Sequence, residues 1–448
     1  MTVMKREAIT ILNSLGAGVV PRTGLRYIAV GRLQEIAALK QDLDHNREGG
    51  ATVRFIIGRY GSGKSFLLQL MRTYALESRF VVADVDFSPE RRLYGSGNEG
   101  LATYIELMKN LSTQTRPDGD ALPAIIEKWI SNIQTEVAAT SGLGPDSPQF
   151  VNQVKTRIIG TLNEMQELVH GFDFGSVLAA YYQGYSENNE ELKTCAVRWL
   201  RGEYTTKTEA FAALKVRSII DSSNYYDYLK TLAGFVHKIG YAGLVICLDE
   251  AAYLYKITNS ISRNNNYEVI LSIVNDCLQG KASHIGFLIG GTPEFLEDPR
   301  RGLFSYEALR SRLAPNRFLG EGLQDFSGPV LKLSSLSAEE IFVLLQKIRD
   351  IHRDQAAIKI EMTDQDIHAY MEETLRRMGA KEFTTPRELI REFVNLLNLL
   401  VQYPQKTWRE IVLGLPAPKE ETLSADISDE SNPADDDPLN RFNDFKVK

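Results

Sequence analysis

Residues 58–65 read Gly58-Arg59-Tyr60-Gly61-Ser62-Gly63-Lys64-Ser65. This stretch has the form G-x-x-x-x-G-K-S, the P-loop signature. The run Val53-Arg54-Phe55-Ile56-Ile57 before it is typical of a buried parallel strand, and good helix formers follow from Phe66 to Ala75. A strand, a glycine-rich turn and a helix N-terminus in this order predict a site for nucleotide phosphates. The alternative is a chance match in a structural loop, which would not require a strand before the motif and a helix after it.

The residues of the P-loop have different predicted roles. The glycines let the backbone approach the phosphates without a side-chain clash. Lys64 supplies a positive charge for the β- and γ-phosphates, and the Ser65 hydroxyl is placed to ligate Mg²⁺. The predicted nucleotide-binding residues of this stretch are Gly58, Tyr60, Gly61, Ser62, Gly63, Lys64, Ser65 and Phe66. We expect ATP or GTP as the ligand, with Mg²⁺.

Composition excludes several classes of protein. The chain has 448 residues, enough for two or three structural units, with 43% hydrophobic and 24% charged residues. Its net charge of −7 argues against a uniformly basic nucleic-acid binder but leaves a local basic surface open. Three cysteines and six scattered histidines form no disulfide or zinc pattern. With no signal-peptide core and no membrane-spanning stretch, we expect a cytoplasmic protein.

A second motif supports the first. Leu244-Val245-Ile246-Cys247-Leu248 runs into Asp249 and Glu250, which predicts a buried strand that delivers two carboxylates to its C-terminal edge. We interpret it as a Walker B motif, with Asp249 holding Mg²⁺ and Glu250 orienting or deprotonating the attacking water. The alternative is a strand that ends in a solvated acidic pair.

Four further residues have both a catalytic and a structural interpretation. Thr292 follows the predicted strand 284–291 and matches the γ-phosphate sensor of AAA+ proteins, but it is also a good N-cap before Pro293. Arg310 and Arg312 lie where AAA+ proteins carry an arginine finger, which acts on a neighbouring subunit; the alternative is a solvated helix face. Arg387 begins a helix and matches the second sensor arginine, or is simply exposed.

The segment Val30-Gly31-Arg32 precedes the P-loop by about 25 residues. In AAA+ and STAND-type ATPases a similar segment lies beside the nucleotide base, so Gly31 and Arg32 are predicted to bind nucleotide. An ordinary helix entry would look the same.

The strand and helix patterns predict an α/β P-loop NTPase of AAA+-like type, with a parallel five-stranded sheet, a large helical insertion and a C-terminal helical lid. Strands are expected at 53–57, 80–87, 244–248, 284–291 and 330–333, and some 130 surplus residues before Leu244 form the insertion. The expected divisions are 1–97 (N-terminal segment and first part of the core), 98–243 (mainly the insertion), 244–336 (second part of the core), 337–414 (lid) and 415–448 (disordered acidic tail).

These pieces together resemble a known family. The P-loop, Leu248-Asp249-Glu250, Gly290-Gly291-Thr292-Pro293-Glu294-Phe295 and Ala308-Leu309-Arg310-Ser311-Arg312-Leu313 stand in the order seen in BrxD-type ATP-binding proteins. Gly18-Val19-Val20-Pro21 and Val30-Gly31-Arg32 precede them in the same way. The resemblance spans roughly residues 5–412, with Ser65 where threonine is frequent. It implies an ATPase of bacterial BREX and related anti-phage systems, often encoded beside a helicase and thought to act on or with DNA.

We therefore expect a Mg²⁺-dependent ATP hydrolase that forms a homo-oligomer and acts with a DNA-processing protein partner such as a helicase, with no membrane contact. DNA is reached directly or through that partner. One alternative is a STAND-like scaffold, in which nucleotide exchange sets an assembly state without DNA. The other is a helicase loader that binds DNA itself, and salt-sensitive DNA binding would identify it.

Overall fold

The computed structural model describes residues 3–144, 147–165, 170–318, 324–355, 361–377 and 385–414. The predicted acidic tail, residues 415–448, lies outside this described part. No helix within the described part is long and apolar enough to cross a membrane.

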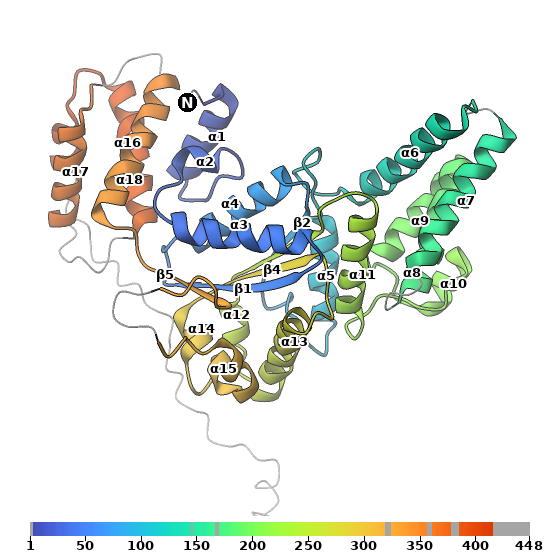
Figure 1. The fold of residues 1–448 in the computed structure, drawn as a ribbon. Coiled ribbons are helices and arrows are strands. Elements are labelled where there is room, and N and C mark those ends of the chain that lie inside the picture. Colours follow the sequence, from blue (N-terminus) through green and yellow to red (C-terminus); the bar gives the residue numbers. More distant parts are fainter. Residues whose placement is uncertain are drawn as a thin grey trace, which may run out of the picture.

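A five-stranded parallel sheet lies at the centre of the molecule (Figure 1). Its strands, in chain order, are β1 (Ala51–Gly58), β2 (Val81–Asp86), β3 (Leu244–Asp249), β4 (Ile285–Gly291) and β5 (Val330–Leu333). They are arranged β2-β3-β4-β1-β5, and every neighbouring pair is parallel. The prediction of an α/β fold with such a sheet is confirmed. Because the strands are parallel, residues that follow β1, β2, β3 and β4 meet at one edge.

Side chains of β1 alternate between two apolar layers, as the pleat requires. Phe55 and Ile57 belong to a core that includes residues of α5 (Glu99–Lys109), α11 (Tyr225–Lys238) and α13 (Ser260–Leu278). Ile56 packs on the other face with residues of α3 (Leu33–Arg47) and α4 (Lys64–Glu77). Helices therefore cover both faces, which explains why the strands are apolar in nearly every position.

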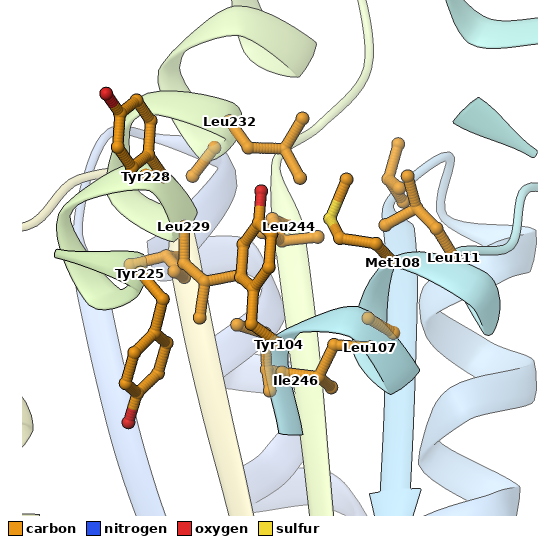
Figure 2. Packing of buried hydrophobic residues seen from close by; sticks show 14 of the residues in the cluster. Tyr104, Leu107, Met108, Leu111, Tyr225, Tyr228, Leu229, Leu232, Leu244 and Ile246 are labelled. Atoms are coloured by element: carbon orange, nitrogen blue, oxygen red, sulfur yellow. The ribbon is translucent and has the colours of Figure 1, made fainter. Parts of the chain in front are cut away.

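The core beside β3 is built largely from aromatic side chains (Figure 2). Tyr104 of α5 and Tyr225 and Tyr228 of α11 are buried against Leu244 and Ile246 of the strand. The Tyr104 hydroxyl donates to the Leu200 carbonyl (2.7 Å) and the Tyr225 hydroxyl to the Leu93 carbonyl (2.9 Å). The hydroxyls of Tyr104 and Tyr225 thus have hydrogen-bond partners, and the rings serve packing.

Among the described residues between α5 and α11, five helices form an arm that projects from one end of the sheet (Figure 1). They are α6 (Leu122–Ser141), α7 (Pro148–Glu164), α8 (Gly171–Ser186), α9 (Glu190–Leu200) and α10 (Lys207–Leu214). Their buried side chains, including Trp129, Leu178 and Trp199, are continuous with the core under the sheet.

The helices at the other end of the sheet form a separate apolar cluster, which we call the C-terminal bundle (Figure 1). Its members are α1 (Lys5–Gly16), α16 (Ala338–Gln355), α17 (Asp364–Arg377), α18 (Pro386–Gln402) and α19 (Trp408–Leu413). Ile11 of α1 packs here together with Leu345 and Phe393. Ile28, from the short helix α2 (Leu25–Ile28), joins the same cluster. The first helix of the chain thus completes a bundle made mostly from the last ones.

The remaining helices lie between β3 and β5 in the chain. They are α12 (Ala252–Tyr255), α14 (Pro293–Glu297), the 3₁₀ turn Leu303–Ser305 and α15 (Glu307–Leu313).

Candidate nucleotide-binding site

The P-loop joins the end of β1 to the start of α4, as its sequence predicts. Gly61 and Gly63 have φ angles of 78° and 89°, a region that side chains other than glycine rarely adopt. A Cβ at Gly58 would collide with the Ser62 hydroxyl, and a Cβ at Gly61 would lie 2.8 Å from Cβ of Thr385. The tight turn and the approach of α18 therefore both require glycine.

Lys64 lies at the first turn of α4 with its amine over the loop. Its Nζ donates to the carbonyls of Gly58 (2.9 Å) and Arg59 (3.0 Å). Burial lowers the pKa of Lys64, and the charges of Asp249 and Glu250 oppose that shift. The amine and both acids therefore share one electrostatic environment.

Ser65 and Asp249 are brought into direct contact across the sheet edge. The Ser65 hydroxyl donates to Oδ2 of Asp249 at 2.6 Å. A hydroxyl and a carboxylate side by side suit Mg²⁺, which prefers oxygen ligands and takes few from the protein because it keeps waters and phosphate oxygens. Within the described residues no group of three or more His, Cys, Asp or Glu forms a protein-only metal cage. The donor set therefore fits a nucleotide-bound Mg²⁺.

Glu250 follows β3 in a left-handed conformation, with φ of 57°. Its N–H donates to Oδ1 of Asp249 (2.8 Å), which fixes the turn. Burial raises the pKa of the Glu250 carboxyl, the Asp249 charge adds to the shift, and Lys64 opposes it. A carboxyl with these surroundings is suited to accepting a proton from water.

Asp86 lies at the same edge of the sheet as Asp249, although it was not predicted as a site residue. It is the last residue of β2 and pairs in register with Asp249. Burial and then the Asp249 charge raise its pKa, while Arg91 and Arg22 lower it. The signal was an acid at the end of a predicted strand, but only the strand order places β2 beside β3.

A pocket of about 180 Å³ opens beside the P-loop. Its lining includes Tyr60, residues 61–67 of the P-loop and the start of α4, and Glu250. Its apolar side is made by the N-terminal segment and the C-terminal bundle, through Val19, Val20, Pro21, Ile28, Val30, Leu336, Leu344 and Ile390. A phosphate-binding loop next to a largely apolar lining matches a ligand with phosphates at one end and a flat base at the other.

Arg387 reaches the P-loop from the first turn of α18. Its guanidinium donates to the Tyr60 hydroxyl (2.5 Å) and lies 5.4 Å from the centre of that ring. Thr385 and Glu388 form the capping box that begins the helix, and Arg387 lines the pocket. Thr384, part of the predicted helix start, lies outside the described residues.

The two predicted residues of the N-terminal segment have different positions. Arg32 lines the pocket, and its guanidinium donates to the Ser62 carbonyl at 3.2 Å. Gly31 is packed against Glu340 of α16, with no room for a Cβ. Val30 was not predicted as a site residue, but it also lines the pocket.

Thr292 and the two arginines of α15 already have structural partners. The Thr292 hydroxyl accepts the Phe295 N–H (3.4 Å) as N-cap of α14, directly after β4 and hence beside the end of β3. Arg312 donates to Oδ1 of Asn275 in α13 (2.7 Å) and to the Ala308 carbonyl (2.7 Å). Arg310 is 61% exposed, and it forms a 3.8 Å ion pair with Glu307 of the same helix.

Comparison with known families finds a match over nearly the whole chain. The family model described as "BREX system ATP-binding protein BrxC/D" matches residues 3–414. Among curated proteins, none matches.

Proposed function

Because the chain belongs to the family of BREX system ATP-binding proteins BrxC/D, we propose that it is an AAA+-type ATPase that hydrolyses ATP with Mg²⁺ in anti-phage defence. The observation that carries this proposal is the meeting of Lys64, Ser65, Asp249 and Glu250 at one edge of the sheet, beside the pocket. A family of ATP-binding proteins favours ATP over GTP.

Nucleotide binding would use both the P-loop and the apolar lining of the pocket. The P-loop backbone and Lys64 would hold the β- and γ-phosphates, and the apolar side would hold the base. Ser65 and Asp249 would hold Mg²⁺, which supplies charge neutralisation for the phosphates. The C-terminal bundle would act as a lid, since α18 brings Arg387 to the P-loop.

Hydrolysis would depend on Glu250 as the residue that orients the attacking water and accepts its proton. Lys64 and Arg387 would stabilise negative charge as it develops on the transferred phosphoryl group. Thr292 would sense the γ-phosphate from the end of β4. Arg310, which is exposed, is better suited than Arg312 to reach a neighbouring subunit of a homo-oligomer.

The cellular role would be to drive or switch a DNA-processing partner such as a helicase. Phage defence by the family supports this role, and the net charge of −7 favours DNA contact through a partner over tight binding by the chain alone. ATPase activity that rises when DNA and partner are added together would support it. Turnover that is indifferent to both would favour a nucleotide-switched scaffold instead.

The test of the enzymatic proposal is Glu250→Gln. This variant keeps the size of the side chain and removes the proton acceptor. Phosphate release from ATP should therefore fall about 100-fold or more, while ATP affinity stays within about threefold of the wild type. Full turnover by the variant would refute the role of Glu250. A matched control is Glu294→Gln, an exposed acid on α14 whose charge also acts on Lys64 but which does not line the pocket.

A further inference from the structure

The segment 29–32, which joins α2 to α3, is attached to the C-terminal bundle. Nζ of Lys347 in α16 donates to the Ala29 carbonyl at 2.6 Å. Two residues later, Gly31 lies directly against the carboxylate of Glu340. Because Glu340 forms the capping box with Ser337 that begins α16, this contact ties the segment to the first turn of that helix.

The same segment is attached to the P-loop through Arg32. The guanidinium of Arg32 donates through one nitrogen to the Ser62 carbonyl (3.2 Å) and to the Ser334 carbonyl. Its other terminal nitrogen donates to Oε1 of Glu35 (3.3 Å). Ser334 directly follows β5 and belongs to the connection that leads into α16. One side chain therefore bridges the phosphate-binding loop and the connection to the bundle.

The backbone of the segment is held in an unusual form. Gly31 and Arg32 have φ angles of 60° and 58°, and for Arg32 this left-handed conformation is unfavourable because of its Cβ. The Arg32 side chain is only 12% exposed. Both terminal nitrogens of Arg32 are engaged by protein oxygens rather than directed freely into the pocket.

We propose that Arg32 is a positioning residue that couples the P-loop to the C-terminal bundle, and that it is not a direct ligand of the nucleotide. The inference rests on the proposed ATP binding at the P-loop. Occupation of the loop would fix the Ser62 carbonyl, and Arg32 would pass this constraint to Ser334 and α16. A planar guanidinium can bridge two carbonyls at once, which a lysine ammonium on a flexible stem does less well.

Hydrogen exchange on the full chain, with and without MgATP, tests this coupling. In the wild type, MgATP should slow exchange both at the P-loop amides, 58–65, and in α16, 338–355. In Arg32→Ala the P-loop protection should remain and the MgATP dissociation constant should change by less than about threefold. The MgATP-dependent protection of α16 should fall by about half or more. Arg26→Ala, which removes a half-exposed arginine of α2, is the matched control and should respond like the wild type.

Two results with Arg32→Ala would overturn the inference. The first is an α16 response equal to that of the wild type. The second is a loss of MgATP affinity of about tenfold or more together with the P-loop protection, which is expected if Arg32 binds the nucleotide itself. If the wild type binds no MgATP, the proposed function fails and the inference fails with it, a result distinct from the other two. Should Arg32→Ala not fold, Arg32→Lys makes the same test, with the same loss of α16 protection expected.

Discussion

Burial acts on opposite charges at Lys64 and Glu250. It lowers the pKa of the amine and raises that of the carboxyl, so in each case it favours the neutral form. Each group partly offsets the shift of the other, because the charged pair is mutually stabilising. A nucleotide's phosphates would add negative charge, which favours the protonated amine and raises the basicity of Glu250 further.

Arg387 provides the residue-scale prediction. Its guanidinium lies at the P-loop, in contact with Tyr60, where it can interact with the terminal phosphate. Arg387→Ala should lower kcat/KM for ATP about tenfold or more, because a charge-assisted contact to phosphate is lost. Steady-state phosphate release measures this change. Arg409→Ala, an exposed arginine on α19, is the control; equal activity of the two variants would exclude a role for Arg387.

Single residues were predictable where a local motif defines them. The P-loop and Walker B sequences place Lys64, Ser65, Asp249 and Glu250, and the structure brings these four residues together. Asp86 was missed because its relation to Asp249 depends on strand order, which no local pattern encodes. The contacts of Arg32 with Ser62 and Ser334 were missed for the same reason, since Ser334 is about 300 residues away in the chain.

At the scale of elements, a capping sequence can indicate the residue at which a helix begins. The sequence Ser337-Ala338-Glu339-Glu340 fits the capping-box pattern, and the reciprocal hydrogen bonds between Ser337 and Glu340 are present at the start of α16. All five strands lie within a few residues of the expected positions. The short helix α2 was missed because four residues carry no helical periodicity. The helices of the insertion were expected only as a region, although Ser147, Asn189 and Thr206 cap the starts of α7, α9 and α10.

A histidine pair between α11 and β4 gives a prediction on pH. His237 and His284 stack with ring centres 3.4 Å apart, and His284 Nδ1 lies 3.2 Å from the Asn46 carbonyl oxygen. Burial, and next the His237 charge, lower the pKa of His284 below 6.5. Below about pH 6.5, His284 therefore binds a proton more readily in the unfolded chain than in the folded protein. Its contribution to the free energy of unfolding is present above that pH and is lost as the pH falls.

The measurement is the fall in Tm between pH 7.5 and pH 5.5. His284→Asn should be less stable at the higher pH but should show a smaller fall than the wild type, because the titrating group is gone. Asparagine tolerates the left-handed φ of 55° at this position. The control is His368→Asn, which changes an exposed histidine of α17 and should leave the fall unchanged. An unchanged fall in His284→Asn would contradict the account.

At the scale of the whole molecule, the sheet separates two helical regions, the arm at one end and the C-terminal bundle at the other (Figure 1). The first helix, α1, packs with α16 and α18 in the bundle. Such a contact joins opposite ends of the chain and leaves no local signal. The resemblance to a family was the only sequence feature that bore on the molecule as a whole, and the family match confirms it.

Assembly is tested by comparing the two arginines of α15. Arg310→Ala should leave Tm unchanged but should lower turnover per subunit, which in the wild type should rise with protein concentration as subunits associate. Arg312→Ala should instead lower the free energy of unfolding by about 1–2 kcal/mol, through loss of its bond to Asn275. Thermal melts and turnover over a range of protein concentrations separate the two effects. Turnover independent of concentration would exclude a finger acting between subunits.

The central claim is that Lys64, Ser65 and Asp249 hold the phosphates and Mg²⁺ of one ATP, and calorimetric titration of the purified chain tests it most directly. The wild type should bind MgATP at one site per chain, and removal of Mg²⁺ should weaken that binding. Lys64→Ala should weaken MgATP binding about tenfold or more, while Ser65→Ala should abolish most of the difference that Mg²⁺ makes. A wild type that binds no ATP, or a Lys64→Ala variant that binds MgATP as tightly as the wild type, would contradict the account.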